Sequence, residues 1–541
     1  MLNLWYKNAV IYCVDVDAFQ DQDGDGVGDF RGLTDRLDHI EALGADCIWL
    51  LPFYPSPNQD NGYDISDYFG VDSRLGTLGD FVEFTHAARD RGLRVIVDLV
   101  VNHSSIEHPW FQASRAGHPK YKDWYVWKKE RPEDHAKGVI FPGVQESTWT
   151  FDRRRQEYYF HRFYKHQADL NIANPEVREE IDRIMGFWLA LGVSGFRIDA
   201  VPFLIEDLAD AGSGQSPYEY LGRMRQFLDW RRAEAILLAE ANIPMEEAGD
   251  YFGDGDRLNL IFNFPLNQRV FLALARRDGA PVRDFLSAMP EIPATSQWAT
   301  FLRNHDEIDL GRLSDEERQE AFAAFGPEKS MQIYDRGIRR RLAPMLGGDE
   351  RRIAMAMSLM LSLPGTPVIW YGDEIGMGDN LDLPERTAVR TPMQWSSEPN
   401  GGFSTAAPED CVRLPVAEGP FAYAHINAES QRIDPQSLFS VTQRLIRARR
   451  SAPEIGWGSC RVIDLGETSV IALLAEWQGG RVLTLHNLGE EPVTIDCGEA
   501  LAGAPVRPLL QSGIDIDRTD GGCRIRLGAY GYEWMRVAAG G

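Results

Sequence analysis

Short apolar runs alternate with amphipathic stretches along the first four hundred residues. Eight runs rich in β-branched and aromatic residues predict strands over residues 9–14, 46–51, 93–100, 195–199, 235–240, 260–264, 299–304 and 367–371. Between the first two runs, four apolar residues recur at helical spacing and a glycine is placed to end the helix: Leu33, Leu37, Ile40, Leu43 and Gly44. Strands that alternate with helices are typical of a parallel sheet, and eight of them predict an α/β fold of the closed (β/α)8 TIM-barrel type.

The alternation is interrupted after the third strand and ends before the C-terminus. The segment after residue 103 is rich in aromatics, Pro and Lys, and the helical pattern resumes at Asn174 and Pro175, a favourable helix start. From residue 452 onward, short alternating runs and Gly-rich turns predict a β-sandwich. The expected division is a catalytic barrel of residues 1–103 and 174–451, an inserted subdomain B of residues 104–173, and a C-terminal sandwich of residues 452–541.

Composition narrows the range of partners. The chain is 44% hydrophobic, as soluble globular proteins are, and it has no apolar run near the roughly 20 residues that span a bilayer. A formal net charge of −25 disfavours nucleic-acid phosphates and anionic lipids. The N-terminus lacks a secretory-signal pattern, and the six cysteines form no Cys-x-x-Cys pair. We therefore expect a cytoplasmic protein that acts on a small neutral molecule and binds neither nucleic acid nor membrane.

Polar side chains collect at the ends of the predicted strands, where the active site of such a barrel lies. They are Asp98, Asn102, His103, Arg197, Asp199, Glu240, His305 and Asp306. Two carboxyl groups that flank a sugar bond can act as nucleophile and protonated acid. Arg197 faces the same side of its strand as Asp199 and is expected to keep it ionised. One rim acid alone would more often cap a helix or bind a metal, but this cluster favours catalysis.

Four stretches carry a more specific resemblance. They are Asp-Leu-Val-Val-Asn-His at 98–103, Gly-Phe-Arg-Ile-Asp-Ala-Val at 195–201, Leu-Ala-Glu-Ala-Asn at 238–242 and Arg-Asn-His-Asp at 303–306. In order and spacing they resemble the four signature strands of the α-amylase family of retaining glycosidases. The resemblance implies that Asp199 is the nucleophile, Glu240 the general acid and base, and Asp306 the transition-state stabiliser.

The same resemblance implies a glucose-binding subsite. Its expected members at the strand ends are Arg197, His103 and His305. Gly62-Tyr63-Asp64 resembles the element that stacks a tyrosine on the terminal glucose and holds its hydroxyls with an aspartate, which implies an exo-acting pocket.

The oligosaccharide-glucosidase branch of the family supplies two further expectations. Arg390 resembles the arginine that pairs with the aspartate of this element, and Arg386 is the alternative. Gln167 opens Gln-Ala-Asp-Leu-Asn, which is close to this branch's Gln-Pro-Asp-Leu-Asn signature, and is expected to bind substrate.

The loop after the first strand offers oxygen ligands for a metal. They are the carboxylates of Asp21, Asp23, Asp25 and Asp29 and the carbonyl of Val27, which match the start of an EF-hand loop. Gly32 stands where an EF-hand has its bidentate glutamate, so we expect a structural Ca²⁺, with Mg²⁺ and a solvated acidic turn as the alternatives. No organic cofactor is expected.

A second Ca²⁺ is implied by related enzymes and not by spacing. Its expected ligands are the side chains of Asn102, Asp169 and Glu206 and the carbonyls of Phe203 and Leu204.

Longer stretches resemble the trehalose synthases, the branch of this family that interconverts maltose and trehalose. They include residues 239–242, 292–298 and 336–344, and the resemblance covers about the first 450 residues. An isomerase and a hydrolase share the first step and differ in whether trapped glucose or water receives the glucosyl group, so enclosure of the pocket is decisive. The alternatives are an α-glucosidase or glucosyltransferase acting on another small α-glucoside and, more remotely, a non-catalytic binding protein on the same barrel.

The chain departs from the trehalose-synthase pattern at two positions. Gly138 stands where an arginine is expected and Gly311 where an acid is expected, although their apparent partners Asn242 and Glu307 remain. We count these two partners as substrate-binding and predict a looser pocket, with side hydrolysis or a different acceptor. The favoured reaction is isomerisation of maltose and trehalose through a covalent β-glucosyl-enzyme on Asp199. The oligomeric state stays open, a homo-oligomer included.

Overall fold

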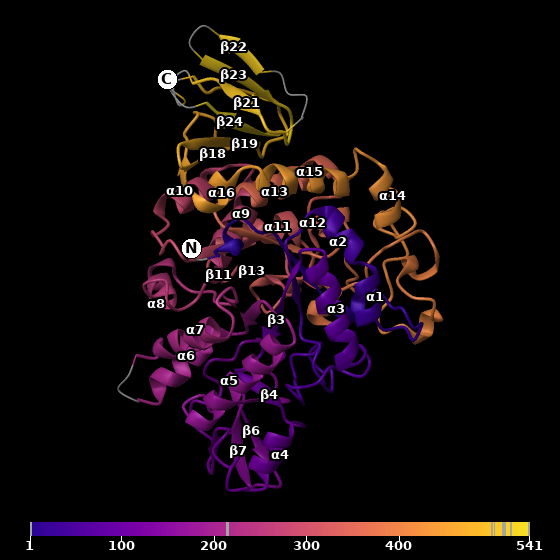
Figure 1. Ribbon diagram of the computed structural model, residues 1–541, viewed down its shortest axis with the longest axis vertical. Helices are drawn as coiled ribbons and strands as arrows, with labels where there is room; N and C mark the ends of the chain where they lie inside the picture. Colours follow the sequence, from indigo (N-terminus) through magenta and orange to yellow (C-terminus); the bar gives the residue numbers. More distant parts are fainter. Residues whose placement is uncertain are drawn as a thin grey trace.

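A closed barrel of eight parallel strands forms the middle of the molecule (Figure 1). The computed structural model describes residues 3–212, 216–498, 501, 504–510, 516–519 and 522–538. Its barrel strands are β1 (Ile11–Val14), β2 (Cys47–Leu50), β3 (Arg94–Leu99), β9 (Gly195–Ile198), β10 (Ile236–Ala239), β11 (Leu260–Phe262), β12 (Gln297–Phe301) and β16 (Thr366–Trp370). Each strand pairs with the barrel strand before and after it in sequence, and β16 closes on β1. The predicted fold class is confirmed, and each of the eight predicted strands overlaps an observed one.

The helix between the first two strands differs in one detail from the prediction. It forms two pieces, α1 (Phe30–Asp35) and α2 (Leu37–Leu43), which meet at Arg36. The Arg36 guanidinium lies over the ring of Trp395 at 4.4 Å, and its Nε donates to Gln20. These tertiary contacts hold Arg36, which lies between α1 and α2, in a backbone conformation that is not helical. Gly44 ends α2 with a φ of 98°, as its position predicts.

The other predicted helix start is confirmed. α5 (Pro175–Ala190) begins directly after Asn174, whose side chain accepts the amide of Glu176. Its buried face includes Trp188, which packs edge-on against Phe53 and Phe81 and donates its indole N–H to a backbone carbonyl. Through these rings α5 packs on α3 (Leu78–Asp90) and on the chain that leaves β2.

Two additions extend from the barrel to the two ends of the long axis in Figure 1. Between β3 and β9 the chain forms a subdomain of β4 (His103–Ser105), α4 (Pro109–Arg115), β5 (Trp127–Lys128), β6 (Trp149–Asp152), β7 (Glu157–Phe160) and β8 (Gln167–Asp169). β4 pairs antiparallel with β8, so Gln167 and Asp169 lie beside the strand end at His103. The subdomain therefore lies over the rim where the predicted site residues collect.

The C-terminal sheets lie at the other end of the molecule. One is the sheet of β17 (Ser459–Val462), β18 (Val470–Trp477), β19 (Gly480–Asn487), β24 (Tyr532–Val537) and β21 (Val506–Pro508), and the other contains β20 (Val493–Asp496), β23 (Gly522–Leu527) and β22 (Ile516–Thr519). Trp534 and His486 both contact the hydroxyl of Ser358 on α13 (Glu350–Ser362). These buried contacts attach the sandwich to the barrel. Part of the predicted range 452–541 lies outside the described residues.

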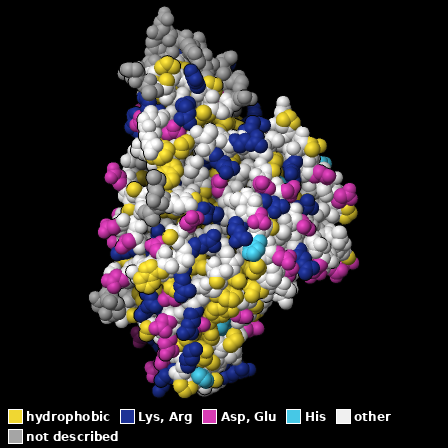
Figure 2. Space-filling view, viewed as in Figure 1, with side chains coloured by type: hydrophobic (Ala, Val, Ile, Leu, Met, Phe, Trp, Pro, Cys, Tyr) yellow, Lys and Arg dark blue, Asp and Glu magenta, His cyan; other side chains and the backbone are white. Residues whose placement is uncertain are grey.

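The surface seen in Figure 2 carries acidic and basic side chains interspersed with one another. Among the described residues, no helix has the length and apolar character that a membrane span requires.

We predict that Trp188→Ala destabilises the barrel, because the indole is fully buried between α5 and α3. Removing a buried tryptophan leaves a cavity and costs about 3–5 kcal/mol. Urea unfolding followed by circular dichroism should show a lower midpoint. Trp230→Ala is the matched control, since 79% of this side chain is exposed on α7 (Glu219–Arg231). Equal midpoints for the two variants would contradict the prediction.

Candidate active site

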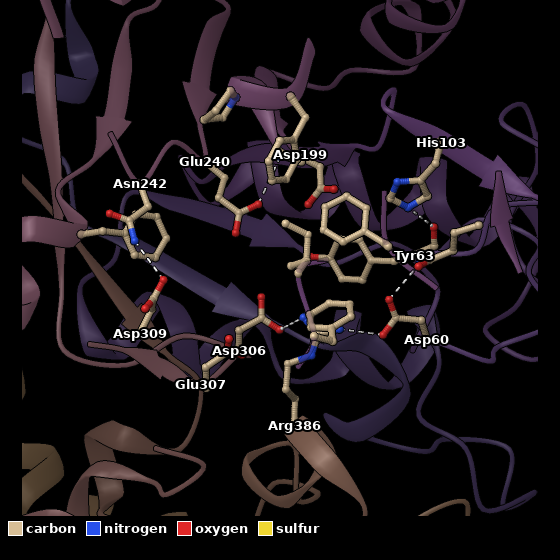
Figure 3. A pocket seen from close by; sticks show the side chains of 18 of the residues that line it. Asp60, Tyr63, His103, Asp199, Glu240, Asn242, Asp306, Glu307, Asp309 and Arg386 are labelled. Atoms are coloured by element: carbon tan, nitrogen blue, oxygen red, sulfur yellow. Dashed lines mark hydrogen bonds and ion pairs between the residues drawn. The ribbon is translucent and has the colours of Figure 1, made fainter. Parts of the chain in front are cut away.

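A cavity of about 320 Å³ opens at the carboxyl ends of the barrel strands, beneath the inserted subdomain. Eight of the predicted catalytic and substrate-binding residues line it, as Figure 3 shows for most of them: Tyr63, His103, Gln167, Asp199, Glu240, Asn242, Asp306 and Glu307. The lining also includes three charged residues that were not predicted from the sequence as site residues, Asp60, Asp309 and Arg336, and Arg386, the alternative to Arg390. The strand-end cluster is therefore one pocket, with a volume that suits a small ligand.

One buried arginine organises the first wall of this pocket. Arg197 is 1% exposed, and its Nη1 lies 2.6 Å from Asp98 and 2.5 Å from Asp199, while its Nη2 lies 2.7 Å from Glu240. Asp98 sits on β3 opposite Arg197 on β9, and Glu240 directly follows β10. The predicted pairing of Arg197 with Asp199 is present. The same guanidinium brings the two carboxyl groups together at close range, as a retaining mechanism requires.

The two carboxyl groups differ in their electrostatic surroundings. Burial raises the pKa of Glu240 to about 7, although Arg197 opposes the shift. Burial also raises the pKa of Asp199, and its short contact with Arg197 works against this rise. A carboxyl group with a pKa near neutrality can donate a proton, and one held against a guanidinium can attack as an anion. The wall therefore holds a protonatable acid next to a carboxylate that can attack as an anion.

Asp306 forms the opposite wall with cations of its own. It accepts hydrogen bonds from Arg386 at 2.9 Å and Arg390 at 2.8 Å, and it lies 3.2 Å from His305. Burial alone raises the pKa of Asp306, but these neighbours hold it well below its usual range. This carboxylate therefore stays ionised and can accept hydrogen bonds from sugar hydroxyls.

The predicted role of Asp64 is wrong, and Asp60 holds the expected position. Asp64 is fully buried and accepts hydrogen bonds from Ser56 and from the backbone amides of Gln59 and Asp60. It therefore faces its own loop. Asp60 lines the cavity instead and accepts from Gln167.

The predicted arginine partner is corrected in the same way. Arg386 joins Asp60 and Asp306 at 2.9 Å each, whereas Arg390 contacts Asp306 and the carbonyl of His305 and does not reach Asp64. Arg386 was the alternative named from the sequence. Asp60 was missed because it and Asp64 flank the same turn, and no periodicity distinguishes them.

The two histidines are neutral hydrogen-bonding groups. Burial lowers the pKa of His103 to about 4, and the ring donates to the carbonyl of Tyr63. Burial also lowers the pKa of His305, whose ring lies parallel to that of Tyr63 and 2.7 Å from its hydroxyl. The tyrosine ring is thereby fixed at the floor of the cavity.

The residues near Glu240 bear on the predicted looseness of the pocket. Asn242 donates to Asp309 at 2.9 Å and accepts from Arg312 at 2.7 Å. Glu307 lines the cavity, one of its buried carboxyl oxygens has no hydrogen-bond partner among the described residues, and burial raises its pKa to about 7. Asn242 thus has two side-chain partners that were not predicted from the sequence, the acid Asp309 and the arginine Arg312.

Three of the predicted ligands of the first metal site lie close together. Ligand oxygens of Asp21, Asp23 and Asp29 lie within 4.8 Å of one another. Asp25 is not in this group, and its carboxylate accepts the amide of Val27 at 2.8 Å. Three carboxylates at this spacing suit a hard divalent cation.

The second predicted metal set is brought together only in part. Asn102 donates to Asp169 at 3.2 Å, and its buried side-chain oxygen has no partner among the described residues. Glu206 pairs instead with Arg162 at 3.0 Å. Phe203 and Leu204 lie in the first turn of α6 (Val201–Asp210).

Comparisons with known proteins agree with this geometry. Residues 13–325 and 335–458 match the family described as "Alpha amylase, catalytic domain". The chain is 45% identical over 536 residues to a trehalose synthase from Thermus thermophilus, a match that covers 98% of this chain and 55% of the relative. It is 43% identical over 545 residues to the trehalose synthase/amylase TreS of Mycobacterium tuberculosis, covering 98% and 90%. The chain thus spans about half the length of the Thermus relative and most of the mycobacterial one.

A solved structure of a trehalulose synthase has the same architecture as this chain. The trehalulose synthase MutB from Pseudomonas mesoacidophila superposes with a TM-score of 0.78 at 28% identity, and the match covers 99% of each chain.

We predict that cleavage of a small α-glucoside becomes slower on the alkaline side as Glu240 loses its proton. Because burial raises this pKa to about 7, the acid is present below that pH and absent above it. The kcat/KM should fall about tenfold for each pH unit above the pKa.

Glu307→Gln is the matched control, because Glu307 has a pKa of about 7 in the same cavity. This variant should keep the alkaline limb. Loss of the limb in Glu307→Gln would assign it to Glu307 and contradict the role of Glu240.

Proposed function

The chain belongs to the α-amylase family, and from this premise we propose that it isomerises maltose and trehalose, with some hydrolysis as a side reaction. The observation that carries the proposal is a small roofed pocket with a nucleophile and an acid on one wall and an ionised, arginine-held aspartate on the other. The names of the similar proteins support a reaction in which the glucosyl group is returned to a sugar. A small disaccharide is the proposed partner, and the proposed location is the cytoplasm.

The proposed reaction begins with cleavage. The Asp199 carboxylate attacks the anomeric carbon of the terminal glucose while Glu240 gives its proton to the glycosidic oxygen. The bond from that oxygen breaks, glucose leaves, and a β-glucosyl ester forms on Asp199. Asp306 holds hydroxyls of the reacting ring as positive charge develops there, with Asp60 and Arg386 beside it.

The second step returns the glucosyl group. The released glucose turns within the pocket, and its anomeric hydroxyl attacks the ester while ionised Glu240 takes the proton, which gives trehalose and restores both carboxyl groups. If water attacks in place of glucose, the product is a second glucose. The outcome depends on how long the first glucose is held and how well water is excluded.

The roof of the pocket supports retention of glucose. Phe141 from the subdomain packs on Tyr164 at 4.6 Å and on Tyr334 of a barrel loop at 4.7 Å, and Arg386 lies over its ring at 5.2 Å. Tyr164 and Tyr334 both donate to Glu385. These contacts join the subdomain to the barrel above the carboxylates.

Gly138, one of the two glycines that depart from the trehalose-synthase pattern, is not among the residues that line this cavity and lies in a neighbouring hollow with Arg162. Gly138 has a φ of +77°, and a Cβ built there would meet only the end of Arg162, at 3.6 Å. An α-glucosidase, in which water takes the place of the released glucose, is the second candidate.

We predict that the purified protein converts maltose mainly to trehalose, with glucose as the minor product. Chromatography of the sugars at several times of reaction tests this, and glucose as the sole product would replace the isomerase with the α-glucosidase. Asp199→Ala should lower turnover of both disaccharides by at least about 10⁴-fold. Asp254→Ala, at an exposed acid after α8 (Ala248–Phe252), is the control and should act like the wild type.

We also propose a structural Ca²⁺ at Asp21, Asp23 and Asp29, with the Val27 carbonyl and Asp25 as the other predicted ligands. Asp21 also accepts from Ser404, and the amide of Val412 donates to Gly26, so an ion here would brace this loop against residues 403–412. We also propose a second site at Asn102 and Asp169, which the unpartnered side-chain oxygen of Asn102 supports.

We predict that Ca²⁺ raises the thermal unfolding midpoint relative to chelator-treated protein. A ligand at 100 times its Kd stabilises the folded state by about 2.7 kcal/mol. Asp23→Ala should remove this response, because Asp23 is an exposed member of the cluster whose loss disturbs little else. Asp254→Ala should keep it. The same midpoint with and without Ca²⁺ in the wild type would exclude the site.

A further inference from the structure

A hairpin beside the pocket carries an arginine, Arg336, that has no role in the reaction steps proposed above. The hairpin consists of β14 (Gln332–Ile333) and β15 (Gly337–Ile338), and Arg336 ends its turn. The two residues before it, Tyr334 and Asp335, have φ values of 55° and 60°. Left-handed backbone is costly for residues other than glycine, and it concentrates where a side chain must be aimed.

The hairpin is tied to the loop that carries Asp306. β13 (Ile308–Asp309) begins two residues after Asp306 and pairs with β15, and the amide of Leu310 donates to the carbonyl of Arg336 at 2.9 Å. The position of Arg336 is therefore fixed relative to the catalytic loop by backbone hydrogen bonds.

The Arg336 side chain joins the inserted subdomain to the barrel. Its Nη1 donates to the carbonyl of Ile140 at 3.0 Å, and its Nε lies 3.4 Å from Asp309. Asp309 in turn accepts from Asn242. Ile140, Arg336, Asp309 and Asn242 thus form a continuous line of contacts along one side of the cavity, and all four line it.

This line lies on the side of the leaving group. Asn242 is two residues beyond Glu240, and Figure 3 shows the Asn242–Asp309 pair on the Glu240 side of the cavity, away from Asp60 and His103. The general acid protonates the oxygen of the leaving sugar, so the released glucose lies next to Glu240. Arg336 therefore closes the part of the pocket in which that glucose must stay.

The glycine at 311 makes this arrangement possible. A Cβ built on Gly311 would lie 2.9 Å from Oδ1 of Asp309 and 3.1 Å from Cδ of Arg336. A side chain at position 311 would force the Asp309 carboxylate to shift and would press on the Arg336 side chain. The absence of an acid at 311 therefore leaves the space that Arg336 and Asp309 occupy.

We propose that Arg336 is a specificity-determining residue, which decides whether the released glucose or water receives the glucosyl group from Asp199. This inference rests on the proposed function. Arg336 acts by position: its hydrogen bond to Ile140 closes the subdomain over the released glucose, and it takes no part in breaking the bond. Its loss opens the roof to water while Asp199 and Glu240 keep their contacts with Arg197.

The test is the product ratio from maltose. In Arg336→Ala the ratio of trehalose to glucose should fall about tenfold, the effect of losing a charge-assisted hydrogen bond, while total consumption of maltose stays within about twofold. Lys329→Ala is the matched control, because it removes an exposed cation that precedes the same hairpin and contacts Gln332 only among the described residues. It should keep the wild-type ratio.

A second variant disturbs the contact between Arg336 and Asp309 without removing the arginine. Gly311→Ala should displace Arg336 from Asp309 and lower the ratio in the same direction. If circular dichroism shows that Arg336→Ala does not fold, the trehalose-to-glucose ratio is measured in Gly311→Ala and Arg336→Lys instead. An unchanged ratio in these variants, or equal losses of trehalose and glucose formation, would show a structural role alone and overturn the proposal.

A separate measurement distinguishes failure of the inference from failure of the proposed function. If the wild type forms no trehalose from maltose, the isomerase proposal fails. The partition of the glucosyl-enzyme is then measured with nitrophenyl α-glucoside and added glucose, as disaccharide formed per nitrophenol released. Arg336→Ala should move this partition toward water, and an identical partition in the variant and the wild type overturns the role of Arg336.

Discussion

The active site depends on one buried guanidinium that neutralises three carboxyl groups. Arg197 contacts Asp98, Asp199 and Glu240, and these groups come from three neighbouring barrel strands or their ends. Buried carboxylates without a cation would repel one another and lose their hydration. The parallel register sets Arg197 opposite Asp98 on one side and Leu238 on the other, so closure of the barrel itself assembles the cluster.

The number of cations on each wall explains the different roles of the carboxyl groups. On the first wall one arginine serves three acids, which is too little positive charge to ionise all of them, and Glu240 keeps its proton to about pH 7. On the second wall two arginines serve Asp306, whose pKa is held well below its usual range. A proton donor and a permanent anion can thus face each other across one small cavity.

The sequence predicts the strands and the acids at their ends, which follow local patterns. It does not predict which side chains of an irregular loop face the pocket. Strands and strand-end acids are predictable because burial gives continuous apolar runs, and because a residue two positions from another shares its face. Asp60 and Asp64 lie in an irregular turn with positive φ at Asn61 and Gly62, so no period tells which carboxylate faces the pocket. The break at Arg36 has the same origin, since its partner Trp395 is remote in sequence.

The closure of the pocket could not be predicted for a further reason. From the sequence, the glycines at 138 and 311 indicate lost contacts, because each is compared with the side chain expected at its own position. In the folded chain, the space beside Gly311 is occupied by Arg336 from a hairpin and by Asp309 from the loop after Asp306. A missing side chain loosens a pocket only when no other segment takes its place, and that depends on tertiary packing. The roof is therefore set by the pairing of β13 with β15, which aligns a distant arginine with the catalytic loop.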